Sequence, residues 1–292
     1  MTSPLIPQLS GRQLTVDIAL KQPTLIRDQI ARLADAQLIL PKLFRPLGKP
    51  IEGGGLLYSV IKASDGYTTD IEKRAPGNEY RVVEGVDPES RLAEVDDWGG
   101  KFQVPDEQVD RNDVSYLDQQ TTQLSNTIAR KLDTAAVAAI EDAITAENTV
   151  TGHSWANLVT VGPLDALTPS GARPTADLSA AQLAADLQEL GVKHDLLIVH
   201  PQQAHYLRVA YGDNLDEMLK SAGVGLFPSL RIGPGSAYVL AEGQAGVIGF
   251  ERVLTVDTWD DRSTRSKWVQ AYAVPAFAPD KPYALKKLIG LL

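Results

Sequence analysis

The residues with the clearest catalytic potential are Gly152-His153-Ser154-Trp155-Ala156, in which a serine lies between residues typical of a sharp turn. A nucleophilic serine on such a turn needs a strand before it and a helix after it, because that geometry leaves the hydroxyl strained and exposed. Here a long helical pattern precedes Ser154, and residues 157–161 favour a strand after it. Three downstream residues could act as its base: His194, His200 and His205. The pattern therefore favours a plain loop that leaves the helix.

The other patterns with chemical potential are better explained as turns. Gly233-Pro234-Gly235 imitates the start of a dinucleotide-binding loop, but the proline removes an amide donor and no helix follows. A cluster of three aspartates lacks the alternate spacing and the glycine of a calcium loop: Asp257, Asp260 and Asp261. His200 and His205 are five residues apart, which places them about 140° from each other on a helix. We therefore expect neither a metal ion nor a cofactor.

The composition limits the class of protein. The chain has 292 residues, and 43% of them are hydrophobic, which allows a sizeable core. Its net charge of −9 argues against a nucleic-acid-binding surface, because affinity for phosphate requires clustered lysine and arginine. It has no cysteine, which excludes disulfides, thiolate metal sites and cysteine nucleophiles. We expect neither a signal peptide nor a membrane segment, because the first residues lack a basic region and all apolar runs are short.

One long helix organises the elements that would position these residues. No glycine or proline occurs between Pro105 and Gly152, and small or apolar residues recur there with the period of a straight α-helix, about 3.6 residues. A coiled-coil repeat of about 3.5 residues would place Lys131 and Asp142 in the apolar seam, so a coiled coil is disfavoured. We expect a helix over residues 112–146, on the order of 50 Å long. The candidates for its N-cap are Asp110, Asn112 and Asp113.

Residues 49–86 combine strand propensity with a shortage of apolar side chains. A glycine run at 53–55 opens the segment and Ala75-Pro76-Gly77-Asn78 interrupts it, with β-prone residues such as Tyr67 and Ile71 between them. Basic and acidic residues are interspersed throughout: Lys49, Glu52, Lys62, Asp65, Asp70, Glu72, Lys73, Arg74, Glu79, Arg81 and Glu84. A two-stranded excursion of this kind is marginal alone in water, so it needs a neighbour to lie on. This need is the first indication of an assembly protein.

The remaining elements follow from hydrophobic period and turn residues. Residues 1–22 are expected to form an extended arm, and a helix over 24–39 is expected to end at Pro41 and Pro46. Residues 91–104 predict two strands, with Trp98-Gly99-Gly100 as a bend or bulge. Past Gly152 the pattern is mixed α/β, with helices expected at 178–190 (capped by Thr175 or Asp177), 201–210 and 214–221. Strands are expected at 195–200, 237–241, 247–256, 267–274 and 283–289.

The order of these parts resembles the major capsid protein of tailed bacteriophages, in particular of phages of actinobacteria. Ala75-Pro76-Gly77-Asn78-Glu79-Tyr80 is similar to a segment of that family's extended loop, and Trp98-Gly99 is similar to the pair on the strand before its spine helix. His200-Pro201 resembles the opening of a helix in the axial domain. Residues 269–274 resemble the strand that returns to the peripheral domain. The resemblance covers most of the chain.

The resemblance implies an α+β capsid fold in four parts. These are an N-terminal arm with a short helix (1–47), an extended β-hairpin loop (48–88), a peripheral domain with the long spine helix (89–151 and 266–292), and an α/β axial domain (152–265). Contacts between subunits would involve Asp70, Glu72, Lys73, Arg74, Tyr80 and Trp98. Some relatives cross-link a loop lysine to an asparagine of a neighbour. Lys73 lies in the corresponding region, but no partner is recognisable.

The function implied is that of a non-enzymatic subunit that self-assembles as hexamers and pentamers into the icosahedral head shell of a tailed bacteriophage. The shell would enclose DNA without sequence-specific binding. The implied partners are other copies of the chain, a separate scaffold protein, a portal and a decoration protein, with no membrane. The subunit would be assembled in the host bacterial cytoplasm and end in the virion. An encapsulin-type nanocompartment, which shares the fold, is the near alternative, and an α/β hydrolase built on Ser154 is the distant one.

Overall fold

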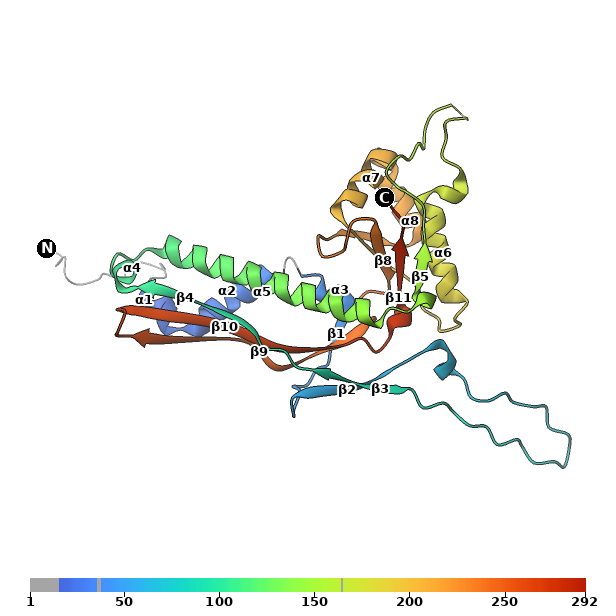
Figure 1. Ribbon diagram of the computed structural model, residues 1–292, viewed down its shortest axis with the longest axis horizontal. Coiled ribbons are helices and arrows are strands. Elements are labelled where there is room, and N and C mark those ends of the chain that lie inside the picture. Colours follow the sequence, from blue (N-terminus) through green and yellow to red (C-terminus); the bar gives the residue numbers. More distant parts are fainter. Residues whose placement is uncertain (1–15, 36–37, 164) are drawn as a thin grey trace. The chain divides into compact units, whose positions relative to one another are not determined.

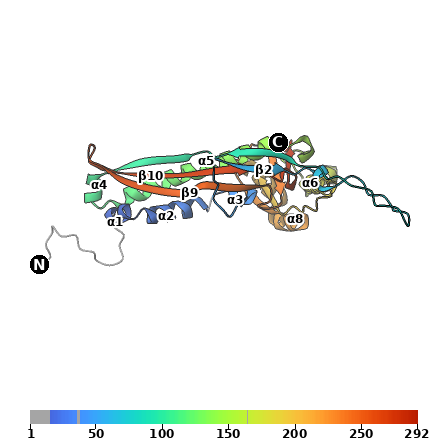
Figure 2. The same ribbon diagram turned by 90° about the horizontal axis from the view of Figure 1, so that it is seen from below.

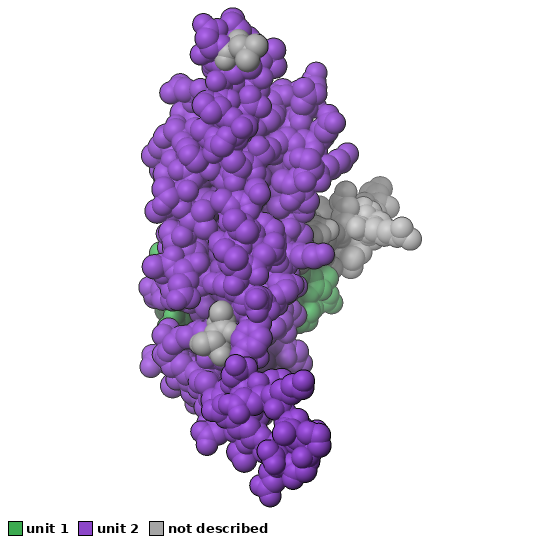
Figure 3. Space-filling view, turned by 90° about the vertical axis from the view of Figure 1, so that its right-hand side faces the viewer, with its two compact units in different colours: residues 1–38, 96–132, 252–275 green, residues 39–95, 133–251, 276–292 purple. Residues whose placement is uncertain are grey.

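The computed structural model describes residues 16–35, 38–163 and 165–292. The arm predicted for residues 1–15 lies outside the described residues. The chain forms two compact units, shown in different colours in Figure 3. Unit 1 contains Met1–Leu38, Asp96–Leu132 and Arg252–Pro275, and unit 2 contains Ile39–Val95, Asp133–Glu251 and Ala276–Leu292. Each unit is described by itself.

Unit 1 contains three short helices, strand β4, the greater parts of strands β9 and β10, and most of the long helix. Helices α1 (Val16–Lys21) and α2 (Pro23–Asp35) come first, so residues 16–21 are helical and not part of an extended arm. Strand β4 (Trp98–Pro105) pairs antiparallel with β10 (Ser266–Ala278), in register from Pro105 opposite Ser266 to Trp98 opposite Ala273. The helix α4 (Asp106–Asp110) follows β4 directly. Strand β9 (Gly246–Asp261) is next to β10 in the order β1-β9-β10-β4.

The regular pairing of β4 with β10 corrects the expectation of a bend or bulge at residues 98–100. A Cβ on Gly99 would lie 2.6 Å from the Cβ of Tyr272 and 2.9 Å from the carbonyl oxygen of Ala271. Both distances are below van der Waals contact, so this strand needs glycine for close approach to β10. Glycine within a strand often marks a bulge, but at position 99 it permits an unbroken ladder.

The long helix is confirmed as α5 (Val114–Ala143), slightly shorter than the predicted span 112–146. Asp113 is the N-cap, since its Oδ1 accepts the backbone N–H of Tyr116 at 3.2 Å. Its carboxylate also accepts the hydroxyl of Ser115 at 2.6 Å, and these hydrogen bonds, Ser115 first, lower the pKa of Asp113. Asn112 instead adopts φ 51° and accepts the backbone N–H of Val16 at 2.9 Å. Asp110 belongs to α4.

Unit 2 is built on a mixed five-stranded sheet in the order β5-β11-β8-β6-β7 (Figure 1). Its strands are β5 (Thr149–Thr151), β6 (Leu196–Val199), β7 (Gly225–Pro228), β8 (Ser236–Leu240) and β11 (Leu285–Ile289). The pairs β11–β5 and β6–β7 are parallel, and β8 is antiparallel to both β11 and β6. Short 3₁₀ helices occur at Ala63–Gly66, Ala146–Asn148, Ser170–Ala172, Gly212–Asn214 and Pro282–Ala284.

Three helices cover one face of this sheet: α6 (Pro174–Asp186), α7 (Pro201–Tyr211) and α8 (Leu215–Ala222). Alternate strand residues such as Leu197 and Val239 pack with apolar side chains of all three helices in one buried cluster. The predicted helices at 201–210 and 214–221 are confirmed, and His200 caps α7 by accepting the N–H of Gln202 at 3.2 Å. The prediction for α6 was wrong at its start, because the helix begins at Pro174 with Arg173 as N-cap.

Two further predictions are corrected in unit 2. Residues 157–161 do not form a strand, and β7 was not expected from the sequence. Pro41 does not end a helix but lies in the first turn of α3 (Leu40–Leu43), which leads into β1 (Phe44–Pro46). Asp133 of α5 accepts hydrogen bonds from the backbone N–H groups of Ile39 and Leu40 at the start of α3, at 3.0 and 3.2 Å.

The predicted hairpin has a shorter ladder than expected. Strands β2 (Gly55–Val60) and β3 (Glu89–Glu94) pair antiparallel, from Gly55 opposite Glu94 to Val60 opposite Glu89. Beyond them, no residue between 67 and 88 is assigned to a strand. The ladder forms where Ile51 and Ala93 pack with Ala276 and Ala278, and it ends where that packing ends. The bounds of the two units differ from those of the four predicted segments. The predicted limits of the capsid domains therefore stay a prediction.

Candidate functional site: the extended loop

The extended loop is defined here as residues 61–88, between β2 and β3. Figure 1 shows its two halves running side by side to a tip. At its base the N–H of Ile61 donates to the carbonyl of Asp280 at 3.0 Å, within unit 2. Further out, Tyr67 donates its hydroxyl to the backbone oxygen of Glu189 at 3.1 Å and lies 3.2 Å from the Oε2 of that residue. Burial raises the pKa of Tyr67, and Glu189 adds to the effect.

Hydrogen bonds across the loop keep its halves in register. The N–H of Thr69 donates to the carbonyl of Glu84 at 3.0 Å, and the N–H of Glu84 donates to the hydroxyl of Thr69 at 3.1 Å. Arg81 forms an ion pair with Glu72 in the opposite half. Because Arg81 and Glu72 are both more than half exposed, this pair orients the chain but adds little stability.

The tip of the loop is a turn closed by the N–H of Asn78, which donates to the carbonyl of Ala75 at 3.1 Å. Gly77 has φ +90°, a conformation that side-chain-bearing residues rarely adopt. Arg74 donates to the carbonyl of Asn78 at 2.8 Å, and its guanidinium lies 4.8 Å from the ring centroid of Tyr80. The tip therefore has a defined shape before any partner is bound.

Five of the six predicted contact residues lie in this loop: Asp70, Glu72, Lys73, Arg74 and Tyr80. Trp98 lies elsewhere, in β4 of unit 1, and is half-buried with its indole N–H unpartnered among the described residues. The role of these residues between subunits stays a prediction.

Sequence reasoning named Tyr80 as a contact residue but missed the other exposed apolar residues of the loop. Val82 is 83% exposed, and Ile71 and Tyr80 are each 77% exposed. Val86 and Tyr67 are also exposed. A series of large exposed apolar side chains on one segment is typical of interaction surfaces. The signal in the sequence was the alternation of Tyr80, Val82 and the charged residues between them.

Ser154 has none of the partners that a nucleophile needs. Its Oγ accepts the N–H of Ala156 at 3.4 Å, and no histidine of the described chain hydrogen bonds to it. His153 points instead to Asp177, with 2.8 Å between its Nδ1 and the carboxylate Oδ1. Asp177 is buried, and its Oδ2 also accepts the indole N–H of Trp155 at 2.8 Å. The carboxylate thus anchors the loop after β5 to α6, and residues 152–156 form the plain loop that the sequence favoured.

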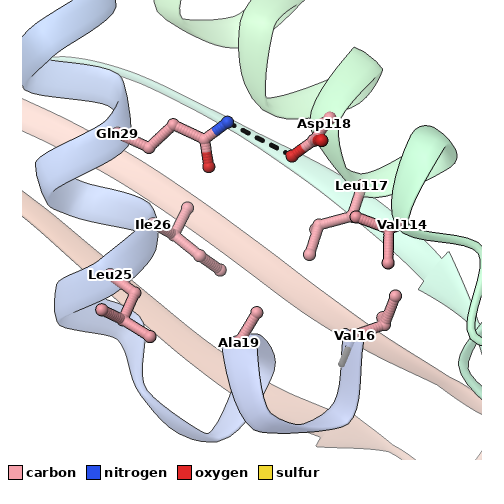
Figure 4. Close-up of a pocket in the computed structure, with 8 residues that line it drawn as sticks. All are labelled: Val16, Ala19, Leu25, Ile26, Gln29, Val114, Leu117 and Asp118. Carbon is pink, nitrogen blue, oxygen red and sulfur yellow. Dashed lines mark hydrogen bonds between the residues drawn. The ribbon is translucent and has the colours of Figure 1, made fainter. Parts of the chain in front are cut away.

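The cavities are small or open. A cavity of about 40 Å³ in unit 1 lies between α1, α2 and α5, where Ile26 and Ala19 face Leu117 and Val114 (Figure 4). Gln29 and Asp118 are joined across its edge by a hydrogen bond of 3.2 Å. Sites for small molecules usually measure roughly 300–1,000 Å³. A second, open hollow of about 300 Å³ lies at the turn between β9 and β10.

The described residues contain no cluster of three or more potential metal ligands. None of the helices in the described part of the chain is long and apolar enough to cross a membrane.

Comparison with known proteins identifies the family. The sequence profile of a family described as phage capsid protein matches residues 88–288. No curated protein shows significant similarity to the chain.

Solved structures of similar fold include capsid proteins and a virus-like particle. The virus-like particle from Pyrococcus furiosus is 16% identical, covers 91% of this chain and 98% of its own, and has a TM-score of 0.59. The protein from Microbacterium phage Oxtober96 is 11% identical, the match covers 87% of this chain and 91% of that chain, and the TM-score is 0.62. The capsid of Myoviridae phage XM1 is 16% identical, the match covers 87% of this chain and 91% of that chain, and the TM-score is 0.58.

The α+β architecture, the 30-residue helix and the exposed loop define a structural protein with a capsid fold, as the resemblance implied. The chain belongs to the phage capsid protein family and is a structural subunit of a phage head shell.

Proposed function

We propose that the subunit assembles as hexamers and pentamers into an icosahedral shell around the DNA of a tailed phage, and that the extended loop of each copy lies on a neighbouring copy. The observation that carries this proposal is the exposure of Ile71, Tyr80 and Val82 on a segment with few contacts to its own unit. Exposed side chains of this size gain free energy when a partner removes them from water, at about 25 cal/mol per Å². Copies of the same chain supply that partner at high local concentration.

The charge of the subunit suits a container for DNA. A net charge of −9 disfavours strong binding of the subunit to packaged DNA, and weak binding leaves the DNA free to move. A separate scaffold protein, a portal and a decoration protein complete the proposed set of partners. The proposed sites are the host bacterial cytoplasm for assembly and the virion for the final shell, and no enzymatic activity is part of the proposal.

The test replaces residues 67–86 with a short Gly-Ser linker, which keeps β2, β3 and their ladder. We expect a soluble subunit that gives no closed particles in negative-stain micrographs or light scattering. A matched control replaces only the tip turn, residues 75–78, and retains Ile71, Tyr80 and Val82. The control should still form particles. Full-size particles from the linker variant would refute the role of the loop.

An encapsulin-type nanocompartment is the second candidate, favoured by the structural match to the virus-like particle over 98% of that chain. The contents of purified particles separate the two. A head shell requires scaffold and portal and takes up DNA, whereas a nanocompartment closes from the subunit alone around a cargo protein.

A further inference from the structure

The five-stranded sheet of unit 2 holds a lysine in its core. Lys286 lies on β11 and is fully buried. Lysine is almost never fully buried unless its charge is compensated, because removing an ammonium group from water is costly. Burial lowers the pKa of Lys286 to about 8, although the charge of Glu147 acts in the opposite direction. At neutral pH a minority of subunits therefore carry the uncharged amine, the nucleophilic form of lysine.

Two side-chain amides receive the amine of Lys286. Its Nζ lies 2.6 Å from the Oδ1 of Asn148 and 2.7 Å from the Oε1 of Gln188. Asn148 is 4% exposed, so its amide is removed from water as well. Strands β11 and β5 are parallel neighbours in which Lys287 lies opposite Thr149 (Figure 1). Lys286 and Asn148 each come one residue earlier, which brings their side chains together.

The amide of Asn148 is held from both ends. Its Oδ1 accepts a second, longer hydrogen bond from the Nε2 of Gln188, at 3.4 Å. Its Nδ2 donates to the hydroxyl of Thr145 at 3.3 Å. Donors at the oxygen draw electrons from the carbonyl carbon, and they act more strongly in a buried site than in water. The arrangement therefore presents an oriented, polarised amide to a buried amine.

This network lies where the extended loop leaves unit 2. Gln188 comes directly after α6 and its capping residue, and the next residue, Glu189, accepts the hydroxyl of Tyr67 through its backbone oxygen. Figures 1 and 2 both show the loop leaving unit 2 beside α6. A bond at Lys286 would therefore strengthen the sheet beside the root of the loop.

We propose that Lys286 and Asn148 of the same subunit join in an isopeptide bond. The Nζ of Lys286, as the uncharged amine, attacks the Cγ of Asn148. The bond between Cγ and Nδ2 breaks, one proton moves from Nζ to Nδ2, and ammonia leaves. The step needs no oxidant, reductant or further reactant, and its product is a secondary amide. The hydrogen-bonded arrangement in the structure is the one that precedes this bond.

Such a bond would close a long loop of the chain. It would join the segment that follows α5 to the C-terminal strand, so residues 148–286 would stay a closed ring when the subunit unfolds. Closing a long loop restricts the unfolded state and so raises stability, as a disulfide does. A chain without cysteine cannot obtain such closure from a disulfide.

The mass of the unaltered subunit tests the proposal. Each bond releases one ammonia, so the intact mass under denaturing conditions should be lower than the sequence mass by one ammonia molecule. A tryptic digest should contain a branched peptide in which Lys286 is uncleaved and bonded to the peptide that contains Asn148. A succinimide at Asn148 would give the same intact mass but only linear peptides, and this result would overturn the proposal.

Two variants serve as controls. Lys287→Arg changes the next lysine of the same strand, which pairs with Glu141, and it should retain the loss of ammonia. Lys286→Met removes the amine and should have the full sequence mass. A folded, unaltered subunit with the full sequence mass, or with a branch that ends on Gln188, would overturn the proposal. Neither result bears on shell assembly, which the micrographs test separately.

Discussion

His194 is a buried histidine with no hydrogen bond to either ring nitrogen among the described residues. Burial, with a smaller contribution from the nearby Lys286, lowers its pKa from 6.5 to about 4. Lys286 is itself fully buried, and its Nζ donates to Asn148 at 2.6 Å and to Gln188 at 2.7 Å. Burial lowers the pKa of Lys286 to about 8. The base of the five-stranded sheet therefore contains two groups whose charged forms are disfavoured by burial: at pH 7 His194 is neutral, whereas Lys286 is still mostly protonated.

His194 makes the subunit sensitive to acid. Between pH 6.5 and about 4 the unfolded chain binds a proton at this position that the folded chain does not, so the free energy of unfolding falls as pH falls. The full effect is on the order of 3 kcal/mol, at 1.36 kcal/mol per unit of pKa. We expect His194→Leu to reduce the loss of stability between pH 6.5 and pH 4.5, measured by urea unfolding of unassembled subunits.

The unaltered subunit must be compared with the His194→Leu variant, because Asp133 changes the free energy of unfolding with pH in the opposite direction. Burial raises its pKa to about 6, so its contribution to stability falls as pH rises from about 4 to 6. Subtracting the two pH profiles isolates His194, and identical profiles for the variant and the unaltered subunit would contradict the assignment. Asp133→Asn is the matched control and should change the slope with the other sign.

A second prediction for a single residue concerns the stability of a variant at Gly99. In Gly99→Ala the new methyl group meets the backbone of β10, which cannot move without breaking the ladder, so we expect a loss of about 1–3 kcal/mol. Gly100→Ala is the matched control, because its methyl group meets only the mobile end of Leu124. The control should be near neutral. Thermal unfolding of both variants tests the prediction, and equal melting temperatures would refute it.

At the scale of elements, the last turns of α5 are joined to the five-stranded sheet through Glu141. Its carboxylate accepts hydrogen bonds from the hydroxyl of Tyr238 on β8 and from the Nζ of Lys287 on β11. Tyr238 is fully buried, and burial followed by this hydrogen bond raises its pKa. One side chain of the helix thus holds two neighbouring strands.

Removing that side chain should weaken the junction. We expect Glu141→Ala to cost about 1–3 kcal/mol, because the hydroxyl of Tyr238 would be left buried without an acceptor. Asp142→Ala, at the exposed neighbouring position, is the control and should change stability by less than about 0.5 kcal/mol. In denaturant unfolding, the double variant Glu141→Ala, Tyr238→Phe should regain part of the stability that Glu141→Ala loses. Strictly additive losses of the two substitutions would count against the junction.

The elements show which parts of the fold could be predicted from the sequence. The helix α5 was predictable because a period of about 3.6 residues sustained without glycine or proline has few other solutions. Strand β6 was equally clear, since all four residues Leu196–Val199 are buried. The start of α6 was not predictable from cap preferences, because Asp177 is used to hold His153 and Trp155. Long-range demands of this kind override local propensity.

The extended loop was predictable as a segment but not as a surface. Charge interspersed with β-prone residues indicated a segment that needs a neighbour to lie on, and this need stays a prediction. The sequence drew attention to charged residues such as Lys73 and Arg74, whereas the exposure of Ile71 and Val82 depends on how the two halves of the loop lie against each other. The stacked pair of Trp259 and Trp268 was also hidden from sequence reasoning, because the two residues come together only when β9 and β10 are neighbours.

At the scale of the whole molecule, charge and apolar surface have opposite effects on assembly. Every copy has a net charge of −9 at pH 7, so copies repel one another at low ionic strength. The extended loop carries exposed apolar side chains such as Ile71 and Val82, and their burial favours association of copies. Closure of a shell therefore requires that burial exceed the repulsion between like-charged subunits.

This balance predicts that salt promotes assembly. Raising NaCl from 0.1 to 1 M shortens the screening length from about 10 Å to about 3 Å, which removes the repulsion and leaves apolar contacts intact. The subunit concentration at which particles appear in light scattering should fall as salt is added, and sulfate should be more effective than chloride because it strengthens apolar burial. Sucrose at constant ionic strength should have a weaker effect, because it does not screen charge. Particles that dissociate as salt is raised would show instead that ion pairs such as those of Arg74 and Glu72 hold the shell together, and the exposed apolar side chains of the loop would lose their proposed role.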